Sequence, residues 1–350
     1  MGVTSSVYDA GHTHVLFGAD ERTGLRTIIA VHSTALGPAL GGTRFYPYES
    51  VDAALHDALR LSRGMTYKNA AAGLELGGGK AVIIGDPRTD KTPDLLRAYG
   101  RIVENLDGLY ITAEDVGTST EDVAIIRETT RHALGLDVAR GGSGDPSPFT
   151  ALGVFCSMQA AAAHKWGSED LHGRTVSVQG VGKVGYHLVR QLVEAGCEVV
   201  VTDVYQPAID RVVKEFGVKS IGSDEIYDID VDIYCPSALG ATLNPETIPR
   251  LQASIVCGSA NNQLATDADA DRLVERDILY APDFVVNAGG VINVSQERRG
   301  YDRERSAEKV RGLKDATSRI LSLASEQGIT PHRAAVQLAE ARIEAAQEQH

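Results

Sequence analysis

Residues 175–204, TVSVQGVGKVGYHLVRQLVEAGCEVVVTDV, constrain the fold most, because two apolar runs flank a glycine-rich turn and a helical stretch. This order is typical of a βαβ unit with parallel strands. Gly180, Gly182 and Gly185 stand at the turn between the first strand and the helix. Glycines at these places allow a tight turn, the approach of backbone amides to a pyrophosphate, and close helix–strand packing. The stretch therefore predicts a Rossmann-type dinucleotide-binding domain.

Asp203 ends the second strand of this unit, 23 residues after Gly180. A carboxylate at this place accepts hydrogen bonds from the adenine ribose hydroxyls and repels the extra phosphate of NADP. We therefore expect NAD as the cofactor. The residues expected to bind it here are Gly180, Val181, Gly182, Lys183, Val184, Gly185 and Asp203. The alternative is a βαβ turn that binds no nucleotide and uses the aspartate as a cap.

The chain has 350 residues, more than a single hydrophobic core usually serves, so two domains are expected. Residues 140–150, RGGSGDPSPFT, are rich in glycine and proline and interrupt the periodic pattern, so we place a hinge there. We expect two α/β domains: residues 1–140 with a C-terminal helix at about 328–350, and a doubly wound domain at 141–327.

Helix and strand signals occur on both sides of this hinge. In the first 140 residues, strand-like runs such as RTIIAVHS alternate with helical stretches, and Ser50 and Thr92 offer N-caps for two of the helices. After the hinge, ALGVFCSMQAAAAHKW predicts a helix, and VDIYCPSA, ASIVCGSA and DILYAPDF predict further parallel strands. The tail predicts helices at about 302–326 and 331–347.

Composition excludes several classes of protein. The charge of −13 comes from 34 basic and 47 acidic residues scattered along the chain, which argues against nucleic acid as a partner. No segment approaches the ~20 apolar residues of a membrane helix, and nothing at the start resembles a secretory signal, so a cytoplasmic protein is expected. The four cysteines are too far apart for a CxxC pair or a zinc knuckle, so we expect free thiols and no metal.

Two lysines stand out in the first half because they frame a segment rich in glycine. Lys68 and Lys80 lie in GMTYKNAAAGLELGGGKAVIIGDP, and we expect glycines 77–79 to admit a small ligand and to expose the Lys80 ammonium. A phosphate-binding P-loop does not fit, because residue 74 is Leu, residue 81 is Ala and a strand follows. By spacing alone, two solvated surface lysines remain an alternative.

Several segments together resemble the glutamate, leucine, phenylalanine and valine dehydrogenase family, most closely its leucine and valine members. They are ALGPALGGTRFYPY, GMTYKNAAAGLELGGGKAVIIGDP, ITAEDVGT, GDPSP, QGVGKVGYHL, GSANNQL and YAPDFVVNAGGVINV, which span almost the whole chain. The resemblance implies reversible, NAD-dependent oxidative deamination of a branched-chain aliphatic L-amino acid to its 2-oxo acid and ammonia. It also implies a first domain for substrate binding and oligomerisation, a cleft between the domains, and a homo-oligomer, either an octamer or a dimer.

The same resemblance assigns roles to individual residues. It makes Lys80 the base, Asp115 an assistant in proton transfer and Lys68 the partner of the substrate carboxylate. Burial and a second ammonium would favour the neutral amine that a base needs. Further substrate-binding residues implied by the family are Leu40, Gly41, Gly42, Ala113, Asn262, Val291 and Val294. The alternative for the apolar Leu40, Ala113, Val291 and Val294 is a place in the hydrophobic core. Further cofactor-binding residues are Ser147, Thr150, Asn261 and Asn287.

The sequence leaves alternatives open for the substrate and for the class of reaction. Leu40 stands where relatives acting on glutamate carry a lysine, which disfavours glutamate. Phenylalanine stays open, because one methylene of pocket volume is worth only about 1–3 kcal/mol of discrimination. A hydroxy-acid or methylene-folate dehydrogenase would differ by its independence of ammonia. A catalytically silent NAD-binding sensor would have no reason to combine Lys68, Lys80 and Asp115. The segment CPSALGA at 235–241 departs from the relatives' pattern.

Overall fold

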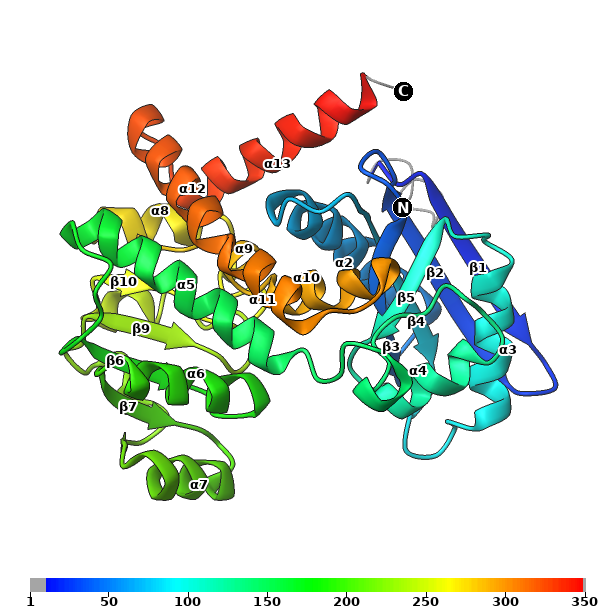
Figure 1. Cartoon of the computed structure of the whole chain (residues 1–350), viewed down its shortest axis with the longest axis horizontal. Coiled ribbons are helices and arrows are strands. Elements are labelled where there is room, and N and C mark those ends of the chain that lie inside the picture. The colour runs from blue at the N-terminus through cyan, green and yellow to red at the C-terminus, as the bar shows by residue number, and fades with distance from the viewer. Residues whose placement is uncertain (1–10, 349–350) are drawn as a thin grey trace. The chain divides into compact units, whose positions relative to one another are not determined.

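The computed structural model describes residues 11–348, which divide into two compact units built around one sheet each (Figure 1). Of the described residues, unit 1 comprises 11–145, 294–303 and 339–348, and unit 2 comprises 146–293 and 304–338. Each unit combines helices with a sheet, so the chain has a two-domain α/β fold.

Unit 1 contains a five-stranded sheet of order β1-β2-β4-β3-β5. Its strands are β1 (His14–Asp20), β2 (Leu25–Ser33), β3 (Ala39–Tyr46), β4 (Gly77–Ile84) and β5 (Tyr110–Glu114). The pairs β1–β2 and β2–β4 are antiparallel, whereas β3 runs parallel to both β4 and β5. The carboxyl ends of β3, β4 and β5 therefore lie at the same end of this sheet.

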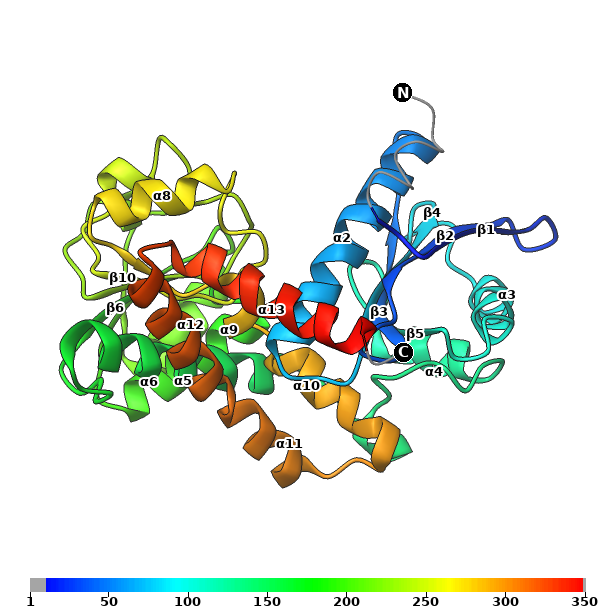
Figure 2. The same ribbon diagram turned by 90° about the horizontal axis from the view of Figure 1, so that it is seen from above.

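Helices cover both faces of this sheet, α2 on one and α3 with α4 on the other (Figure 2). Their bounds are α2 (Val51–Ala71), α3 (Pro93–Glu104) and α4 (Thr120–Arg127). As expected, the Ser50 and Thr92 side chains cap α2 and α3, accepting hydrogen bonds from the backbone N–H groups of Ala53 and Leu95. In β4, Val82 packs toward α2, whereas its neighbours Ala81 and Ile83 pack toward α3.

Unit 2 contains a six-stranded, wholly parallel sheet of order β11-β10-β9-β6-β7-β8. Its strands are β6 (Thr175–Gln179), β7 (Glu198–Thr202), β8 (Lys219–Ser220), β9 (Ile233–Pro236), β10 (Ile255–Val256) and β11 (Leu279–Tyr280). The chain builds outward in one direction from β6 to β8 and then in the other from β9 to β11. This is the strand order of a Rossmann fold, and the direction reverses between β6 and β9, where such folds bind ligands.

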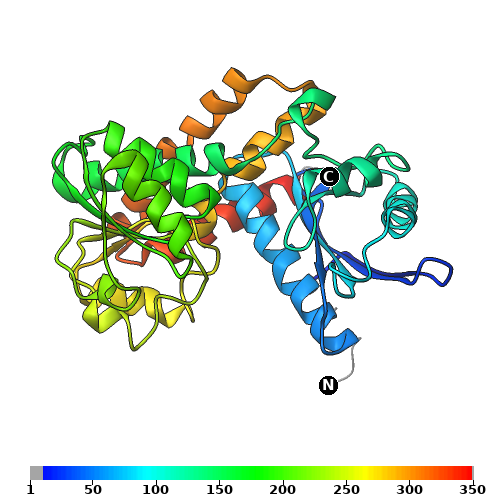
Figure 3. The same ribbon diagram turned by 90° about the horizontal axis from the view of Figure 1, so that it is seen from below.

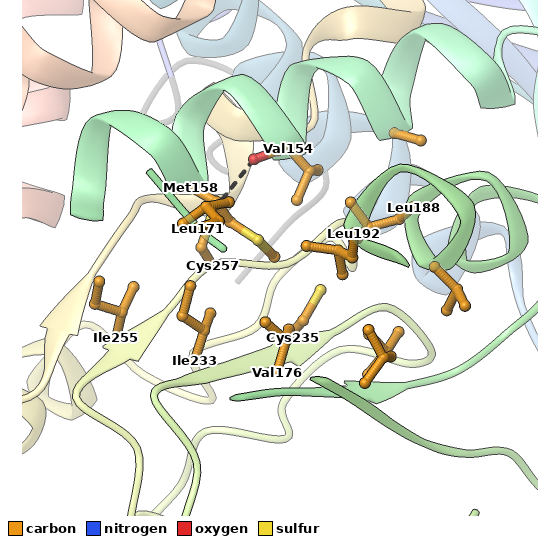
Figure 4. Packing of buried hydrophobic residues seen from close by; sticks show 14 of the residues in the cluster. Val154, Met158, Leu171, Val176, Leu188, Leu192, Ile233, Cys235, Ile255 and Cys257 are labelled. Atoms are coloured by element: carbon orange, nitrogen blue, oxygen red, sulfur yellow. Dashed lines mark hydrogen bonds between the residues drawn. The ribbon is translucent and has the colours of Figure 1, made fainter. Parts of the chain in front are cut away.

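Helices also cover both faces of the second sheet (Figure 3). One face carries α5 (Ser147–Trp166), α6 (Lys183–Glu194) and α7 (Gln206–Phe216), and the other carries η2 (Glu225–Tyr227), η3 (Ile248–Arg250) and α8 (Ala268–Glu275). Figure 4 shows the first of these cores, in which Val154 and Met158 of α5 lie over strand residues such as Ile233. Both faces are apolar, which explains the continuous hydrophobic runs of these strands.

The remaining helices are mostly in the C-terminal part of the chain. They are η1 (Val138–Arg140), α9 (Asp283–Val286), α10 (Gly289–Ser295), η4 (Gln296–Arg299), α11 (Arg303–Arg311), α12 (Leu313–Gln327) and α13 (Pro331–Gln347). The helix expected at 302–326 is in fact two helices, separated at Gly312, a residue that disfavours helix interiors. The helix expected from residue 151 begins earlier, at Ser147, because Pro148 fits the first turn, where no N–H donor is needed.

The four cysteines all lie in unit 2. Cys156, Cys235 and Cys257 are buried, Cys197 is half-buried, and all four are free thiols. Within residues 11–348, no group of three or more histidine, cysteine, aspartate or glutamate side chains is placed to hold a metal ion. No helix in that range is both long and apolar enough to cross a membrane.

Candidate active site

Lys80 and Asp115 meet on the face of the unit 1 sheet that α2 covers. Lys80 lies in β4 and Asp115 directly follows β5, and the Lys80 Nζ atom lies 2.5 Å from Asp115 Oδ2. The Lys80 side chain is 7% exposed and that of Asp115 is 25% exposed. The amino group of Lys80 therefore points at a carboxylate and not into bulk solvent.

The glycines before Lys80 do not expose it, so that expectation was wrong. A Cβ atom on Gly78 would lie 2.1 Å from the backbone nitrogen of Thr66 in α2, and one on Gly79 would lie 2.6 Å from the Tyr110 ring. Protein atoms thus occupy the space that side chains would fill. The glycines let α2 and Tyr110 pack directly on β4, and this close packing buries Lys80.

Gly41 and Gly42, both expected near the substrate, allow similarly close contacts in β3. A Cβ atom on Gly42 would lie 2.4 Å from the Glu114 carbonyl oxygen and 2.9 Å from the Asp115 Cβ atom. A Cβ atom on Gly41 would lie 1.7 Å from the carbonyl oxygen of Gly79. The absence of a side chain at Gly42 therefore lets Asp115 approach the sheet closely enough to reach Lys80.

Arg44 is a residue of this site that the sequence reasoning missed. Its Nε atom donates to Asp115 Oδ2 at 3.1 Å, and its Nη1 atom donates to Asp57 of α2 at 2.8 Å. The Tyr48 hydroxyl donates to the same Asp57 oxygen at 2.7 Å. The alternation of side chains along a strand could have identified Arg44. Residues two apart in a strand share a face, and Arg44 follows Gly42, an expected site residue, by two positions.

Burial and ion pairing set the charges of this cluster. Burial raises the pKa of Asp115, but the Lys80 and Arg44 cations outweigh it and lower the pKa to about 2. Burial lowers the pKa of Arg44, and the Asp115 and Asp57 carboxylates overcome that effect and hold it above its usual value. Burial and the hydrogen bond to Asp57 raise the pKa of Tyr48. At neutral pH, Asp115 is therefore a carboxylate and Arg44 a cation.

Lys68 lies in the last turn of α2, on a half-buried flank of that helix. The flank comprises Asp57, Leu61, Met65 and Lys68, which are all half-buried. Eleven residues separate Asp57 from Lys68, so both project from the same side of the helix, about 16 Å apart along its axis. Because Asp57 binds Arg44, this flank faces the part of the sheet that carries the Lys80–Asp115 pair.

Two of the residues expected around the substrate side chain lie on one face of the unit 1 sheet. Leu40 pairs with Gly78 and Ile111, and it is 1% exposed. Ala113 pairs with Gly42 and is half-buried, so it lies on the same sheet face as Leu40. Two other expected residues lie in α10, where Val291 is half-buried and belongs to unit 2, whereas Val294 is buried and belongs to unit 1.

The three glycines of the turn in unit 2 differ in how closely other atoms surround them. Gly180 has φ +101°, and a Cβ atom there would lie 2.7 Å from the backbone nitrogen of Ala238, in the loop that follows β9. At Gly185 a Cβ atom would lie 2.1 Å from the carbonyl oxygen of Gly180. At Gly182, in contrast, it would meet no atom within 4 Å. The turn is therefore closely packed at its two ends and open in the middle.

Helix α6 begins at this open position. Gly182 is its N-cap and provides no side-chain hydrogen bond, Lys183 is exposed and Val184 is half-buried. The Asp203 carboxylate accepts hydrogen bonds from the backbone N–H groups of Val181 at 2.7 Å and Tyr205 at 2.9 Å. An uncapped helix N-terminus with open space in front of it fits a pyrophosphate, and Asp203 stands at the end of the neighbouring strand.

The other expected cofactor residues of unit 2 lie in two places. Ser147 and Thr150 are in the first turn of α5, where the Thr150 hydroxyl donates to the carbonyl oxygen of Pro146 at 3.2 Å. Asn287 is buried, and its Nδ2 atom donates to Asn261 Oδ1 at 2.9 Å. The buried Oδ1 atom of Asn287 accepts no hydrogen bond from any residue between 11 and 348. Asn262, which was expected at the substrate, is exposed and has φ +52°.

A Rossmann-type unit with an open glycine turn, joined to a second α/β unit with a buried lysine–aspartate pair, defines a two-domain dehydrogenase. The chain belongs to the glutamate/leucine/phenylalanine/valine dehydrogenase family of amino-acid dehydrogenases. Residues 12–132 match the family's dimerisation domain, and residues 141–205 and 201–350 match its second domain.

Individual relatives agree with this family. The chain is 52% identical to leucine dehydrogenase of Bacillus subtilis over 95% of its own length and 92% of the relative's. It is 51% identical to valine dehydrogenase of Streptomyces virginiae, over 95% of this chain and 94% of the relative. The crystal structure of L-tryptophan dehydrogenase from Nostoc punctiforme matches with a TM-score of 0.87 and 45% identity, covering 99% of this chain and all of the other.

Proposed function

We propose that this enzyme catalyses reversible, NAD-dependent oxidative deamination of a branched-chain aliphatic L-amino acid to its 2-oxo acid and ammonia. The observation that carries the proposal is the buried contact between Lys80 and Asp115, in a chain about half identical to leucine and valine dehydrogenases. The apolar Leu40 and Ala113 on the same sheet face favour an aliphatic side chain. The 45% identity to a tryptophan dehydrogenase makes an aromatic amino acid the second candidate.

Lys80 acts as the base in this proposal. Hydride leaves Cα only when the substrate amine is neutral, so Lys80 takes a proton from the substrate ammonium. It passes this proton to solvent through Asp115 and, neutral again, takes a proton from the water that attacks the iminium carbon. Asp115, in contact with Nζ, stabilises the ammonium that Lys80 becomes and relays the proton of that ammonium to the departing ammonia. Lys68 pairs with the substrate carboxylate and holds Cα in place.

The cofactor site is proposed at the glycine turn of unit 2. When bound, NAD supplies the acceptor for the hydride that leaves Cα. The first backbone N–H groups of α6 would hold the pyrophosphate, and Asp203 would accept hydrogen bonds from the ribose hydroxyls. The unpaired Oδ1 atom of Asn287 offers an acceptor for the cofactor's polar groups.

We also propose that the chain forms a homo-oligomer through unit 1. The match of residues 12–132 to a dimerisation domain supports this assembly. Light scattering during size-exclusion chromatography distinguishes a dimer from an octamer by mass.

The proposed function is tested by following NADH formation with a panel of L-amino acids at alkaline pH. Leucine, valine and isoleucine are expected to give the highest kcat/KM, above phenylalanine and tryptophan, with glutamate inactive. The reverse reaction should require ammonia together with the 2-oxo acid. Absence of NADH formation with every amino acid would contradict the proposal, whereas a preference for tryptophan would replace the branched-chain substrate with the second candidate.

Substitution of Lys68 tests the carboxylate role. Removing its ammonium in Lys68→Ala costs a charge-assisted hydrogen bond of about 1.5–3 kcal/mol, so KM for leucine is expected to rise by ~10-fold to ~100-fold. The KM for NAD should change little. Lys165→Ala, which breaks the 2.8 Å ion pair of Lys165 with Asp277 in unit 2, serves as the control. An unchanged KM for leucine in the Lys68 variant would rule out this role.

Substitution of Asp203 tests the cofactor preference. The wild-type enzyme is expected to use NAD much better than NADP, because the Asp203 carboxylate repels a 2′-phosphate. Asp203→Asn removes the charge while keeping an acceptor oxygen, so the ratio of kcat/KM values for NAD and NADP should fall about tenfold or more. Comparable wild-type turnover with both cofactors would remove Asp203 from the assigned role.

A further inference from the structure

Arg44 joins two carboxylates that come from different elements of unit 1. It contacts Asp115 through Nε and Asp57 of α2 through Nη1. Its contact with Asp115 falls on Oδ2, the same oxygen that Lys80 contacts. The Arg44 side chain is 23% exposed, so these ion pairs are partly shielded from solvent.

The two contacts of Arg44 fix its geometry. A guanidinium group is planar, so donation from Nε to one carboxylate and from Nη1 to another sets the direction of both bonds. Asp57 is itself held by the Tyr48 hydroxyl and by Arg60, whose Nη2 atom donates to Asp57 Oδ1 at 3.1 Å. The position of Asp115 is thereby tied to helix α2.

Besides fixing the position of Asp115, Arg44 compensates the negative charge of that carboxylate. With Lys80 protonated, the cations Lys80, Arg44 and Arg60 contact the two carboxylates of Asp115 and Asp57, and only Lys80 and Arg44 contact Asp115. When Lys80 gives up its proton, Asp115 would remain as a half-buried carboxylate without a cation if Arg44 were absent. An unpaired buried charge is strongly destabilising, so a second cation on the same oxygen makes the neutral amine easier to form.

We propose that Arg44, anchored by Asp57, is the positioning residue for Asp115 and keeps that carboxylate paired while Lys80 is neutral. This inference rests on the proposed function, because it assigns Arg44 to the proton transfer of oxidative deamination. Arg44 acts through Asp115 and does not itself take up the proton. The charged or titratable groups in contact with this chain of residues include Tyr48, Arg60 and Lys80, and Lys68 lies further along the same flank of α2.

The test compares the pH profiles of kcat for leucine oxidation in the wild type, Arg44→Gln and Arg44→Lys. In Arg44→Gln, Lys80 is left as the main cation on Asp115 and holds its proton more tightly. The pH of half-maximal kcat should therefore rise by about one unit, and kcat should fall about tenfold or more. Arg44→Lys keeps the charge but cannot bridge both carboxylates, so its pH midpoint should stay near wild type while kcat falls.

Controls separate this role from a structural one. Arg97→Gln breaks the ion pairs of Arg97 with Glu128 and Asp94 on the opposite side of the sheet, and it should leave the pH profile unchanged. Thermal melting and binding of NADH show whether each variant is folded. If Arg44→Gln does not fold, Asp57→Asn provides the test, with a fall in kcat expected at unchanged KM for leucine.

The outcomes distinguish this inference from the proposed function. A wild-type enzyme that forms no NADH with any amino acid contradicts both. An active wild type with an unshifted pH midpoint in folded Arg44→Gln, or wild-type kcat in Asp57→Asn, contradicts the role of Arg44 alone. A midpoint that shifts in Arg44→Gln and returns in Arg44→Lys supports it.

Discussion

The Lys80→Ala variant is expected to lose at least ~100-fold in kcat for leucine oxidation while it still binds NAD, because it lacks the base that makes the substrate amine neutral. The fold should survive, since Asp115 keeps its ion pair with Arg44 when the Lys80 ammonium is removed. Steady-state kinetics give kcat, and isothermal titration calorimetry gives the affinity for NADH.

Two comparisons make this result specific to the amino group. Lys165→Ala, which removes an ion-paired lysine of unit 2, should keep wild-type kcat. Lys80→Arg keeps a positive charge beside Asp115 but cannot become neutral at ordinary pH, so it should be as inactive as Lys80→Ala. Retention of more than about a tenth of the wild-type kcat in Lys80→Ala would exclude Lys80 as the base, given the ~100-fold contribution of general-base catalysis.

The Gly78→Ala variant is expected to lower the free energy of unfolding of unit 1 by about 3 kcal/mol, a cost typical of severe overpacking. The added methyl would lie 2.1 Å from the Thr66 backbone nitrogen and 2.2 Å from its hydroxyl oxygen, and the backbone of α2 cannot yield locally. Helix α2 must therefore move away from β4. Because α2 carries Lys68 and Asp57, both kcat and KM for leucine should worsen.

A matched control lies in the same helix. Gly64 is exposed in α2, and a Cβ atom there would meet nothing within 4 Å. Gly64→Ala should therefore raise stability by about 0.5–1 kcal/mol through helix propensity, without a change in kinetics. Urea unfolding followed by circular dichroism measures both variants. Equal stability of Gly78→Ala and Gly64→Ala would contradict the close packing of α2 on β4.

The sequence was sufficient to predict the Rossmann-type fold, because two glycines of its turn, Gly180 and Gly185, meet backbone requirements that few other residues meet. Gly180 adopts a positive φ, and Gly185 lies against the carbonyl oxygen of Gly180, as the spacing predicted. The strands after it were also recognisable, because residues buried on both faces of a parallel sheet form continuous apolar runs. Both signals lie within short segments of the sequence, so they can be recognised without knowledge of the tertiary structure.

The site in unit 1 was less predictable because its geometry depends on contacts between distant segments. Arg44 and Asp57 are 13 residues apart and Arg44 and Asp115 are 71 apart, so no spacing rule joins them. The glycines before Lys80 were interpreted as space for a ligand, although a helix and an aromatic ring fill that space. A glycine in the sequence indicates only that another group can lie close to the backbone. The structure is needed to tell whether that group is a ligand or another part of the protein.

The most direct measurement of the central claim uses L-leucine that carries deuterium at Cα. If the enzyme removes hydride from Cα of the amino acid, mass spectrometry will find one deuterium in each NADH formed, together with one equivalent of 2-oxo acid and ammonia. NADH without the label, or label released only to water, would contradict oxidative deamination by hydride transfer.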